Sequence, residues 1–529
     1  MKYVQSILLS CAMSVSVGKS QAADKPNILF LFSDDHALNS ISAYGGHLKD
    51  VAPTPHIDRL AKEGAIFENS FCANSICGPS RACILSGKHS HKNGFMRNTG
   101  RGFDQSQWTV AKALHAGGYT TAVIGKWHLK TNPVAFDYWE ILPGQGSYYN
   151  PVFIQMDGSK KKFEGYATDI TTDKAIKWLD NRDKSKPFFL MCQHKAPHRT
   201  FAPALRHLNA FDGVTIPEPP SLFDDYANRS KTLPKNEMEI DRHLRWSYDV
   251  KVRQDEVGDV KLPPAPRGGP AEYNRMTPKQ KAVWDAHFGP KNKAFLADVK
   301  AGKLSHKEIV RWKYQRYLKN YLGTVKAVDE SVGRMLDYLE KNGLAENTIV
   351  IYSSDQGFYL GEHGWFDKRW MFEESFKMPF LIRWPGVVKP GSRPKELIQN
   401  IDYAPTFLDV AALSVPEDVQ GKSIVPVLKG EAKNWRESVY YAYYEIGEHA
   451  VPQHFGVRTE THKLFYLPGT DEWQMFDLVK DPEEMKSVHD DPEYAEIRKA
   501  LTKEYHRLRK QYEAPTYEEY APKRKAQKK

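Results

Sequence analysis

Short apolar runs alternate with amphipathic stretches over most of the chain after residue 26. The run 27–33, NILFLFS, is continuously apolar, as in a strand that is buried on both faces of a sheet. The stretch 55–62 carries apolar residues on one side, with Thr54 as its expected cap and Gly64 as its expected end, which predicts a helix. This alternation is typical of an α/β domain with a large, mainly parallel sheet flanked by helices.

The same alternation predicts further elements up to about residue 413. Strands are expected at 119–124, 188–192, 348–353 and 380–383, and helices at 110–116, 171–179, within 307–342 and at 405–413. Between about 207 and 303 the pattern gives way to Pro-rich and charged sequence, which predicts a loop-rich insertion near a functional face.

The periodicity changes again beyond about residue 434. Strand candidates at 439–445, 454–458 and 463–467 are closely spaced, and a helical pattern follows across 494–512. These features predict a smaller antiparallel α+β domain over 434–515, after a catalytic domain over 23–433.

The two ends of the chain differ in composition from the rest. Lys2, the apolar run 7–17 and the small residues of Ser20-Gln21-Ala22 predict a signal peptide over 1–22, so we expect export to the periplasm or the medium. A lipoprotein signal at Cys11 is the less favoured alternative, because the apolar stretch before it is very short. No later stretch approaches the ~20 apolar residues of a transmembrane helix. Residues 516–529 form a basic tail.

Charge and cysteine content exclude two classes of protein. The net charge of +10 falls to about +3 once two lysines of the leader and the five basic residues at 523–529 are set aside, which is too diffuse for nucleic-acid binding but does not repel an anionic substrate. Beyond the leader the cysteines are Cys72, Cys77, Cys83 and Cys192, and their spacing shows no disulfide framework.

The stretch 77–88, CGPSRACILSGK, carries the most specific signal. Pro79 suits the first turn of a helix, so Cys77 is expected at a helix N-terminus, where N–H groups favour anions. Unmodified, this cysteine is either a low-pKa thiol or a buried one. Cys77, Pro79 and Arg81, with Ser80 and Gly87, resemble the signature of the type I sulfatases. The resemblance implies an alkaline-phosphatase-like fold and a maturation enzyme, formylglycine-generating or equivalent, that oxidises the cysteine to formylglycine.

Paired polar residues follow two predicted strands. Asp34-Asp35 and Asp355-Gln356 stand directly after apolar runs, at the strand ends where open α/β folds place ligands. Three carboxylates and an amide oxygen suit Ca²⁺ better than Zn²⁺, whereas a lone pair of this kind would be a solvated turn. Both pairs resemble the sulfatase calcium ligands, which implies that Asp34, Asp35, Asp355, Gln356 and the modified Cys77 bind Ca²⁺. Gln356 stands where many members have Asn or His.

The resemblance extends to the residues that bind sulfate and move protons. Lys126 and His128 in GKWHL are similar to the family's lysine and histidine pair, His198 to the histidine that protonates the leaving group, and Lys368 to a second sulfate-binding lysine. The implied mechanism uses Arg81 and the two lysines to neutralise the sulfuryl group, with His128 as the base. His363 and Arg369 are expected to contact the substrate.

The substrate is expected to be a sulfated glycan. Trp139, Tyr148 and Tyr149 are expected to be exposed and to stack on sugar rings. The runs 142–146, 217–219 and 222–226 resemble bacterial N-acetylglucosamine-6-sulfatases and related polysaccharide sulfatases, which implies an exo-acting enzyme on 6-O-sulfated N-acetylglucosamine or a related glycan. A phosphonate monoester or phosphodiester hydrolase of the same superfamily is the alternative enzyme. A catalytically inactive glycan-binding protein would lack the cysteine or the metal ligands, and this chain has both.

Overall fold

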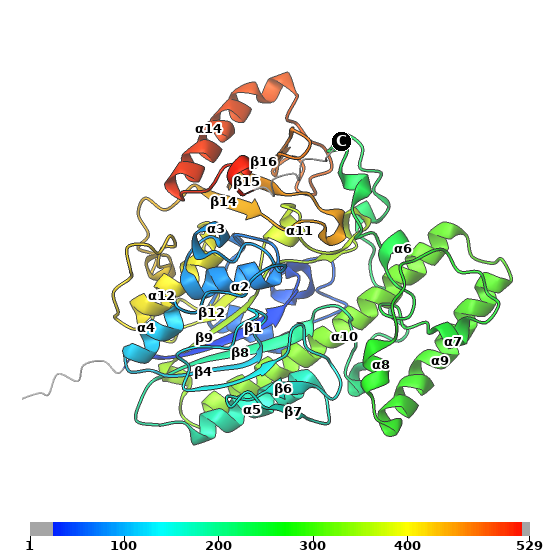
Figure 1. Ribbon diagram of the computed structural model, residues 1–529, viewed down its shortest axis with the longest axis horizontal. Helices are drawn as coiled ribbons and strands as arrows, with labels where there is room; N and C mark the ends of the chain where they lie inside the picture. The colour runs from blue at the N-terminus through cyan, green and yellow to red at the C-terminus, as the bar shows by residue number, and fades with distance from the viewer. Residues whose placement is uncertain (1–24, 521–529) are drawn as a thin grey trace, which may run out of the picture.

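A mixed sheet of nine strands forms the centre of the molecule in the computed structural model, which describes residues 25–520 (Figure 1). The predicted leader over 1–22 lies outside the described residues, as does the tail beyond 520. The five central strands are parallel, in the spatial order β9 (Thr348–Ser354), β1 (Asn27–Asp34), β8 (Phe188–Pro197), β4 (Thr120–Lys126) and β5 (Tyr138–Leu142). The edge strands β12 (Phe380–Arg383), β2 (Ala65–Ile66), β6 (Val152–Ile154) and β7 (Lys160–Lys162) are antiparallel.

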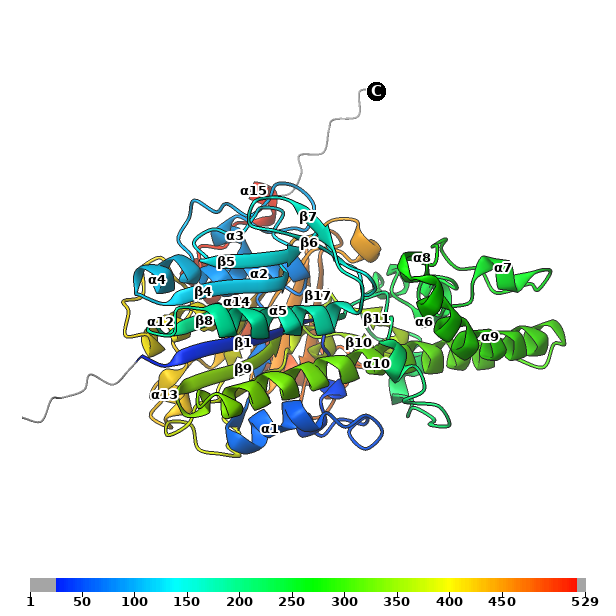
Figure 2. The ribbon, with the colours of Figure 1, turned by 90° about the horizontal axis from the view of Figure 1, so that it is seen from below.

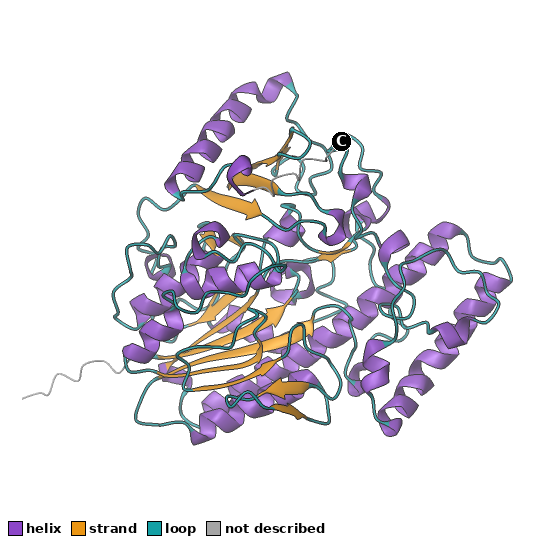
Figure 3. Cartoon of the chain, in the orientation of Figure 1, coloured by secondary structure: helices purple, strands orange, loops and turns teal. Residues whose placement is uncertain are grey.

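Helices cover both faces of this sheet (Figure 3). Helices α1 (Pro55–Glu63), α5 (Ala167–Asn181) and α10 (His306–Lys341) share one hydrophobic core with the sheet. Helices α2 (Cys77–Ser86), α4 (Val110–Ala116) and α12 (Tyr403–Val410) share the other. The predicted α/β layering is therefore confirmed.

Strand β1 is apolar at its five positions from Ile28 to Phe32 because it faces both cores. Ile28, Phe30 and Phe32 pack on the side of α12, whereas Leu29 and Leu31 pack on the side of α5 and α10. Successive side chains of a strand point to opposite faces, so a central strand between two helical layers has no position for a polar residue until it leaves the sheet.

The predicted insertion contains more helix than expected. Helix α9 (Pro278–Lys300) lies within 207–303 and begins at Thr277, whose side chain accepts a hydrogen bond from the backbone N–H of Gln280. Buried Trp284 and Phe288 line one side of it. The sequence analysis missed this helix because Gly289-Pro290 in its middle is typical of a helix end. The capping sequence at Thr277 does indicate where the helix begins. Together with short helices α6 (Ile240–His243), α7 (Gln254–Val257) and α8 (Ala271–Arg275), it forms a lobe beside the sheet (Figure 2).

The C-terminal region forms a four-stranded antiparallel sheet, as predicted. Its strands are β14 (Ser438–Tyr443), β15 (His454–Thr459), β16 (His462–Leu467) and β17 (Glu472–Asp477), followed by helix α14 (Ala495–Gln511). The sequence pattern missed β17. Lys463 of β16 forms ion pairs with Glu484 of the same region and with Glu373, and the pair with Glu373 attaches this sheet to the larger domain. Among residues 25–520, no helix has the length and apolarity that crossing a bilayer requires.

Candidate active site

Two strand ends bring the acidic residues together at the carboxyl edge of the sheet. Asp34 ends β1, and Asp355 directly follows β9, whose Ser354 pairs in register with Ser33. The backbone N–H of Asp35 donates to Oδ1 of Asp355 over 3.0 Å. Asp35 adopts a φ of 65°, a left-handed conformation that is rare for a residue other than glycine. Such local strain is common at functional sites.

Cys77 reaches the same place from the first position of helix α2. One ligand atom each from Asp34, Asp35, Cys77 and His198 lies within 4.8 Å of the others. Burial raises the pKa of the Cys77 thiol to about 12, although Lys368 and Lys126 act in the opposite direction. Of the two alternatives for the unmodified side chain, the structure therefore favours a buried thiol.

Each carboxylate of the cluster has a cationic partner. Lys126 forms a buried ion pair with Asp34, and Nζ of Lys368 lies 2.6 and 2.7 Å from the two carboxylate oxygens of Asp35. Arg81 donates from Nε and Nη2 to Oδ2 of Asp355 over 3.1 and 3.0 Å. The three cations balance the three carboxylates, so these six side chains carry no net charge before a cation or an anion binds.

The free oxygen atoms of this cluster fit a hard cation. Oδ1 of Asp34 and Oε1 of Gln356 are buried without a hydrogen-bond partner among the described residues. Gln356 donates its Nε2 hydrogen to Asp35, which leaves its amide oxygen as the free atom. Burial raises the pKa of Asp35 to about 8, and the charges of Asp34 and Asp355 add to the shift despite the opposing charge of Lys368. A divalent cation among these oxygens would relieve this repulsion, and oxygen donors of this kind suit Ca²⁺.

Two glutamines that the sequence analysis did not select hold the cations in place. Oε1 of Gln145 accepts a hydrogen bond of 2.6 Å from Nζ of Lys126. Oε1 of Gln193 accepts one of 2.9 Å from Nη1 of Arg81. The position of Gln193 in the sequence could have indicated its role, because it lies near the end of a predicted strand, between an apolar run and the histidine motif at 194–198.

The two predicted catalytic histidines face the cluster from different loops. Nδ1 of His198 lies 2.6 Å from the carbonyl oxygen of Arg199, which can only accept, so this nitrogen carries a proton and Nε2 is directed to Asp35 at 3.6 Å. His128 follows β4 with a φ of 59°. Burial, reinforced by the charge of Lys126, lowers the pKa of both histidines well below the usual value. Both are therefore neutral at pH 7 in the absence of a bound anion.

The structure separates the two predicted substrate contacts. Arg369 follows Lys368 directly, and its Nε lies 3.3 Å from Oδ1 of Asp367. His363 instead packs inside the protein, where Nδ1 lies 3.1 Å from Asp224 and Nε2 lies 3.7 Å from Glu374. Its polar contacts do not include the cluster around Cys77, and its role as a substrate contact stays a prediction.

The prediction that three aromatic residues are exposed is wrong, because all three are buried. Trp139 lies in the interior strand β5 and is 6% exposed. The hydroxyl groups of Tyr148 and Tyr149 donate to the carbonyl oxygens of His198 and Pro203, so both rings anchor a loop. These residues therefore cannot stack on a sugar.

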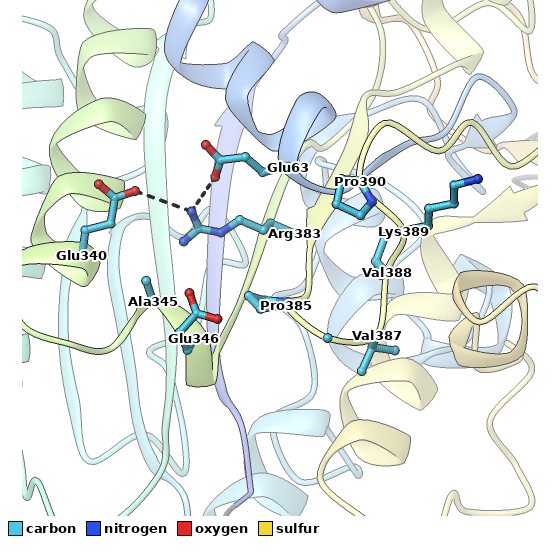
Figure 4. A pocket seen from close by; sticks show the side chains of 11 residues that line it. Glu63, Glu340, Ala345, Glu346, Arg383, Pro385, Val387, Val388, Lys389 and Pro390 are labelled. Carbon is cyan, nitrogen blue, oxygen red and sulfur yellow. Dashed lines mark hydrogen bonds and ion pairs between the residues drawn. The ribbon is translucent and has the colours of Figure 1, made fainter.

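The larger cavities of the protein lie elsewhere. One of about 630 Å³ lies near the amino ends of the parallel strands, on the side of the sheet opposite the acidic cluster. Its lining includes Arg383, which lies between Glu63 and Glu340 (Figure 4). None of the candidate catalytic residues lines this cavity.

Comparisons with known proteins agree with this geometry. Residues 26–413 match the sulfatase family, and residues 361–511 match the C-terminal region of N-sulphoglucosamine sulphohydrolase. An N-acetylglucosamine-6-O-sulfatase of Bacteroides thetaiotaomicron is 45% identical over 515 residues, covering 96% of this chain and 89% of the relative.

Solved structures give the same result. One protein solved in complex with its substrate D-glucosamine-2-N,6-O-disulfate has a TM-score of 0.87 and 45% identity over 93% of this chain and 98% of its own. The phosphonate monoester hydrolase of Agrobacterium radiobacter has a TM-score of 0.62 at 20% identity, covering 92% of this chain and 96% of its own, which shows a shared fold alone. The chain therefore belongs to the sulfatase family and is a sulfuric ester hydrolase.

Proposed function

We propose that this protein is an exported, exo-acting sulfatase that removes the 6-O-sulfate of N-acetylglucosamine or of a related glycan. One observation carries the chemistry: Cys77, Asp34, Asp35 and His198 place ligand atoms within 4.8 Å of one another. The substrate assignment rests on the 45% identity to the Bacteroides enzyme, which covers 96% of this chain.

The side chains around Cys77 would hold the two groups that the proposed reaction needs, a Ca²⁺ ion and a formylglycine at position 77. Asp34, Asp35, Asp355 and Gln356 would hold Ca²⁺, together with the modified residue 77. When bound, Ca²⁺ and the formylglycine made from Cys77 supply a Lewis acid and an acidified hydroxyl nucleophile.

Three cations of the chain itself stabilise the transferring group. Lys126, Lys368 and Arg81 are at most 3% exposed, so their charges act through a medium of low dielectric constant. Because they are already fixed by ion pairs with the carboxylates, little reorganisation is needed when the sulfate oxygens gain charge.

His198 and His128 move the protons. The charge of a bound sulfate raises the pKa of His198, which then carries a proton on Nε2 as well as on Nδ1. This second proton is the one that the leaving sugar oxygen receives, since an alkoxide is a poor leaving group. His128, whose Nδ1 is buried and unpartnered among residues 25–520, acts as the base that restores residue 77.

Arg369 is the residue that we assign to sugar recognition. It is 6% exposed, its Nε and Nη2 lie 3.3 and 3.7 Å from the carboxylates of Asp367 and Glu448, and its Nη1 has no hydrogen-bond partner within the described range. Its backbone is held at a φ of 98°, beside the sulfate-binding Lys368. A buried guanidinium with unused donors beside the sulfate position suits the ring hydroxyl groups of a hexosamine.

The test compares kcat/KM on defined substrates for the mature protein and for Arg369→Ala. We expect 6-O-sulfated N-acetylglucosamine to be the best substrate in a panel of sulfated sugars. Arg369→Ala should lower kcat/KM for this sugar by roughly 10²-fold, but that for a small aryl sulfate by less than about threefold. The exposed Arg393→Ala, which pairs with Glu68 on the surface, is the matched control.

Two results would contradict the proposal. Equal losses on the sugar and on the aryl sulfate would remove Arg369 from substrate recognition. Faster turnover of a phosphonate monoester or phosphodiester than of every sulfated sugar would replace the substrate class. Export is tested separately, by an N-terminus at Ala23 in protein recovered outside the cytoplasm.

A further inference from the structure

Helix α9 and the N-terminal part of α10 form a lobe beside the sheet (Figures 1 and 2). A separate cavity of about 430 Å³ lies between these helices. Helix α10 contributes Trp312, Arg316 and Lys319, whose spacing places them on one face of the helix. Helix α9 contributes His287 and Lys291 at one-turn spacing. We refer to this space as the α9–α10 cavity, and none of the candidate catalytic residues lines it.

Arg316 is a buried cation without an ion pair among the described residues, although the charges of Glu256 and Asp212 act on it from farther away. It is 9% exposed, and its hydrogen bonds come only from Nη1, to the carbonyl oxygen of Val250 at 3.3 Å and to Oδ1 of Asn292 at 3.0 Å. Within residues 25–520 no carboxylate lies within ion-pair distance of it. Its guanidinium is held over the rings of Phe288 and Trp312, at 5.1 and 4.7 Å from their centroids.

Arg383 provides a contrast within the same protein. Arg383 is similarly buried in the 630 Å³ cavity, but it lies 2.8 Å from Glu63 and 3.9 Å from Glu340 (Figure 4). A buried charge without a partner is costly, and burial lowers the pKa of Arg316 to about 10. The remaining donors, Nε and Nη2, have no partner in the described part of the chain and belong to a side chain that lines the cavity.

Two lysines add positive charge to the same cavity. Nζ of Lys291 lies 2.5 Å from Asp212, the single carboxylate of the lining. Lys319 has no carboxylate within ion-pair distance among residues 25–520, and burial together with Lys291 and Arg316 lowers its pKa. Three cations against one carboxylate leave a net positive charge next to the rings of Phe211 and Trp312.

We propose that the α9–α10 cavity is an accessory binding site for a sulfate group carried on a saccharide. Arg316 and Lys319 would bind the sulfate oxygens, and the apolar side chains of Leu208 and Phe211 in the lining would contact the sugar ring. The anion site follows from the unpaired cations alone. That the anion is a saccharide sulfate rests on the proposed function.

Binding is tested on the mature protein with two probes, selenate and a 6-O-sulfated N-acetylglucosamine disaccharide. Crystals soaked in selenate should show an anomalous peak between Arg316 and Lys319, in addition to one beside Lys126 and Lys368. Lys319→Met should weaken binding at the accessory site at least tenfold by calorimetry, and it should leave kcat/KM on an aryl sulfate unchanged. Arg316→Met, which keeps the aliphatic part of the side chain, should do the same.

The half-buried Lys326→Met, on the same helix but outside the lining, is the control and should bind as the unmodified protein does. Absence of selenate from the cavity, or unchanged binding in both variants, would overturn the proposal. Disaccharide binding at least tenfold tighter than inorganic sulfate supports the saccharide assignment, whereas equal affinity overturns it and leaves a site for inorganic anions. A failure of the proposed function would appear instead in the turnover assays, with the selenate peak still present.

Discussion

Cys77 lies buried at the start of α2, and its surroundings decide what this residue can do. With a thiol pKa of about 12, an unmodified cysteine is almost entirely protonated at neutral pH. The cations around it, Lys126 and Lys368, are themselves paired with Asp34 and Asp35. The geometry therefore suits an oxidised residue that works with an ion better than it suits a free thiolate.

The first prediction concerns this cysteine. Cys77→Ala should lower kcat by more than about a thousandfold, because the nucleophile is lost, while unfolding free energy changes by only about 1 kcal/mol. Peptide mass spectrometry of the natively produced protein should show an aldehyde at position 77. Cys192→Ala, another buried cysteine but in the interior of β8, is the control and should keep its kcat. Full turnover by protein that carries an unmodified thiol at 77 would refute the mechanism.

The second prediction concerns His363, whose position implies a structural role. Burial alone would lower its pKa, but the hydrogen bond with Asp224 and the nearby carboxylate of Glu374 raise it to about 9. A histidine with a raised pKa contributes stability that is fully present below the unfolded pKa of about 6.5 and is lost as the pH rises through 9. His363→Gln should therefore lower the unfolding free energy by about 3 kcal/mol at pH 6.

The measurement is denaturant unfolding of both proteins from pH 6 to pH 10. The stability difference between them should shrink steadily between pH 6.5 and pH 9. The kcat/KM values for the sugar and for the aryl sulfate should change by the same factor in this variant. A constant stability difference, or a selective loss on the sugar, would return His363 to the substrate site.

At the scale of elements, strand β4 carries Lys126 to the cluster through a close contact with β8. Gly125, which precedes this lysine, has a φ of 105°, and a Cβ atom there would lie 1.9 Å from the carbonyl oxygen of Gln193. The same Gln193 uses its side chain to accept a hydrogen bond from Arg81. The approach of the two backbones therefore positions two of the three cations of the site.

The third prediction follows from this contact. Gly125→Ala should separate β4 from β8, lower the unfolding free energy by about 3 kcal/mol and reduce kcat at least tenfold. Gly269→Ala is the control, because a Cβ atom there meets nothing within 4 Å. Thermal unfolding and aryl sulfate turnover measure both effects, and a variant as stable and as active as the control would show that the two strands can move apart without cost.

At the scale of the whole molecule, the acidic cluster connects parts of the chain that are far apart in sequence. Asp35 contacts Asp355, Gln356 and Lys368, so β1, β9 and the segment after β9 meet at one point. A cation bound there joins these segments only in the folded state, and binding must therefore stabilise the fold.

The fourth prediction is that Ca²⁺ raises the thermal stability of the protein. Removal of the ion by a chelator should lower Tm by about 3 °C or more and abolish turnover, since ligand at one hundred times its Kd contributes about 2.7 kcal/mol. Added Ca²⁺ should restore both properties, and Asp34→Asn should lose the response. Stoichiometric zinc in the active protein, or full activity after exhaustive chelation, would contradict the assignment.

The sequence by itself predicts the elements and the chemistry that are local in the chain. The apolar run at 27–33 corresponds to β1, and the pattern at 55–62 corresponds to α1. A strand that is buried on both faces is apolar at successive positions, whereas a helix that is buried on one face has apolar residues at helical spacing, so both can be predicted from the sequence. The polar residues directly after β1 and β9 are brought together in the structure, because parallel strands end at the same edge.

Only the tertiary structure decides what depends on contacts between distant residues. His363 and Asp224 are 139 positions apart, and their pairing makes this expected substrate contact part of a buried ion network. The burial of Tyr148 also depends on a contact with a distant residue. The hydrogen-bond partners of Arg316 likewise come from other segments of the lobe. Burial and unpaired charge are properties of the packed molecule, and they cannot be predicted from a local pattern of residues.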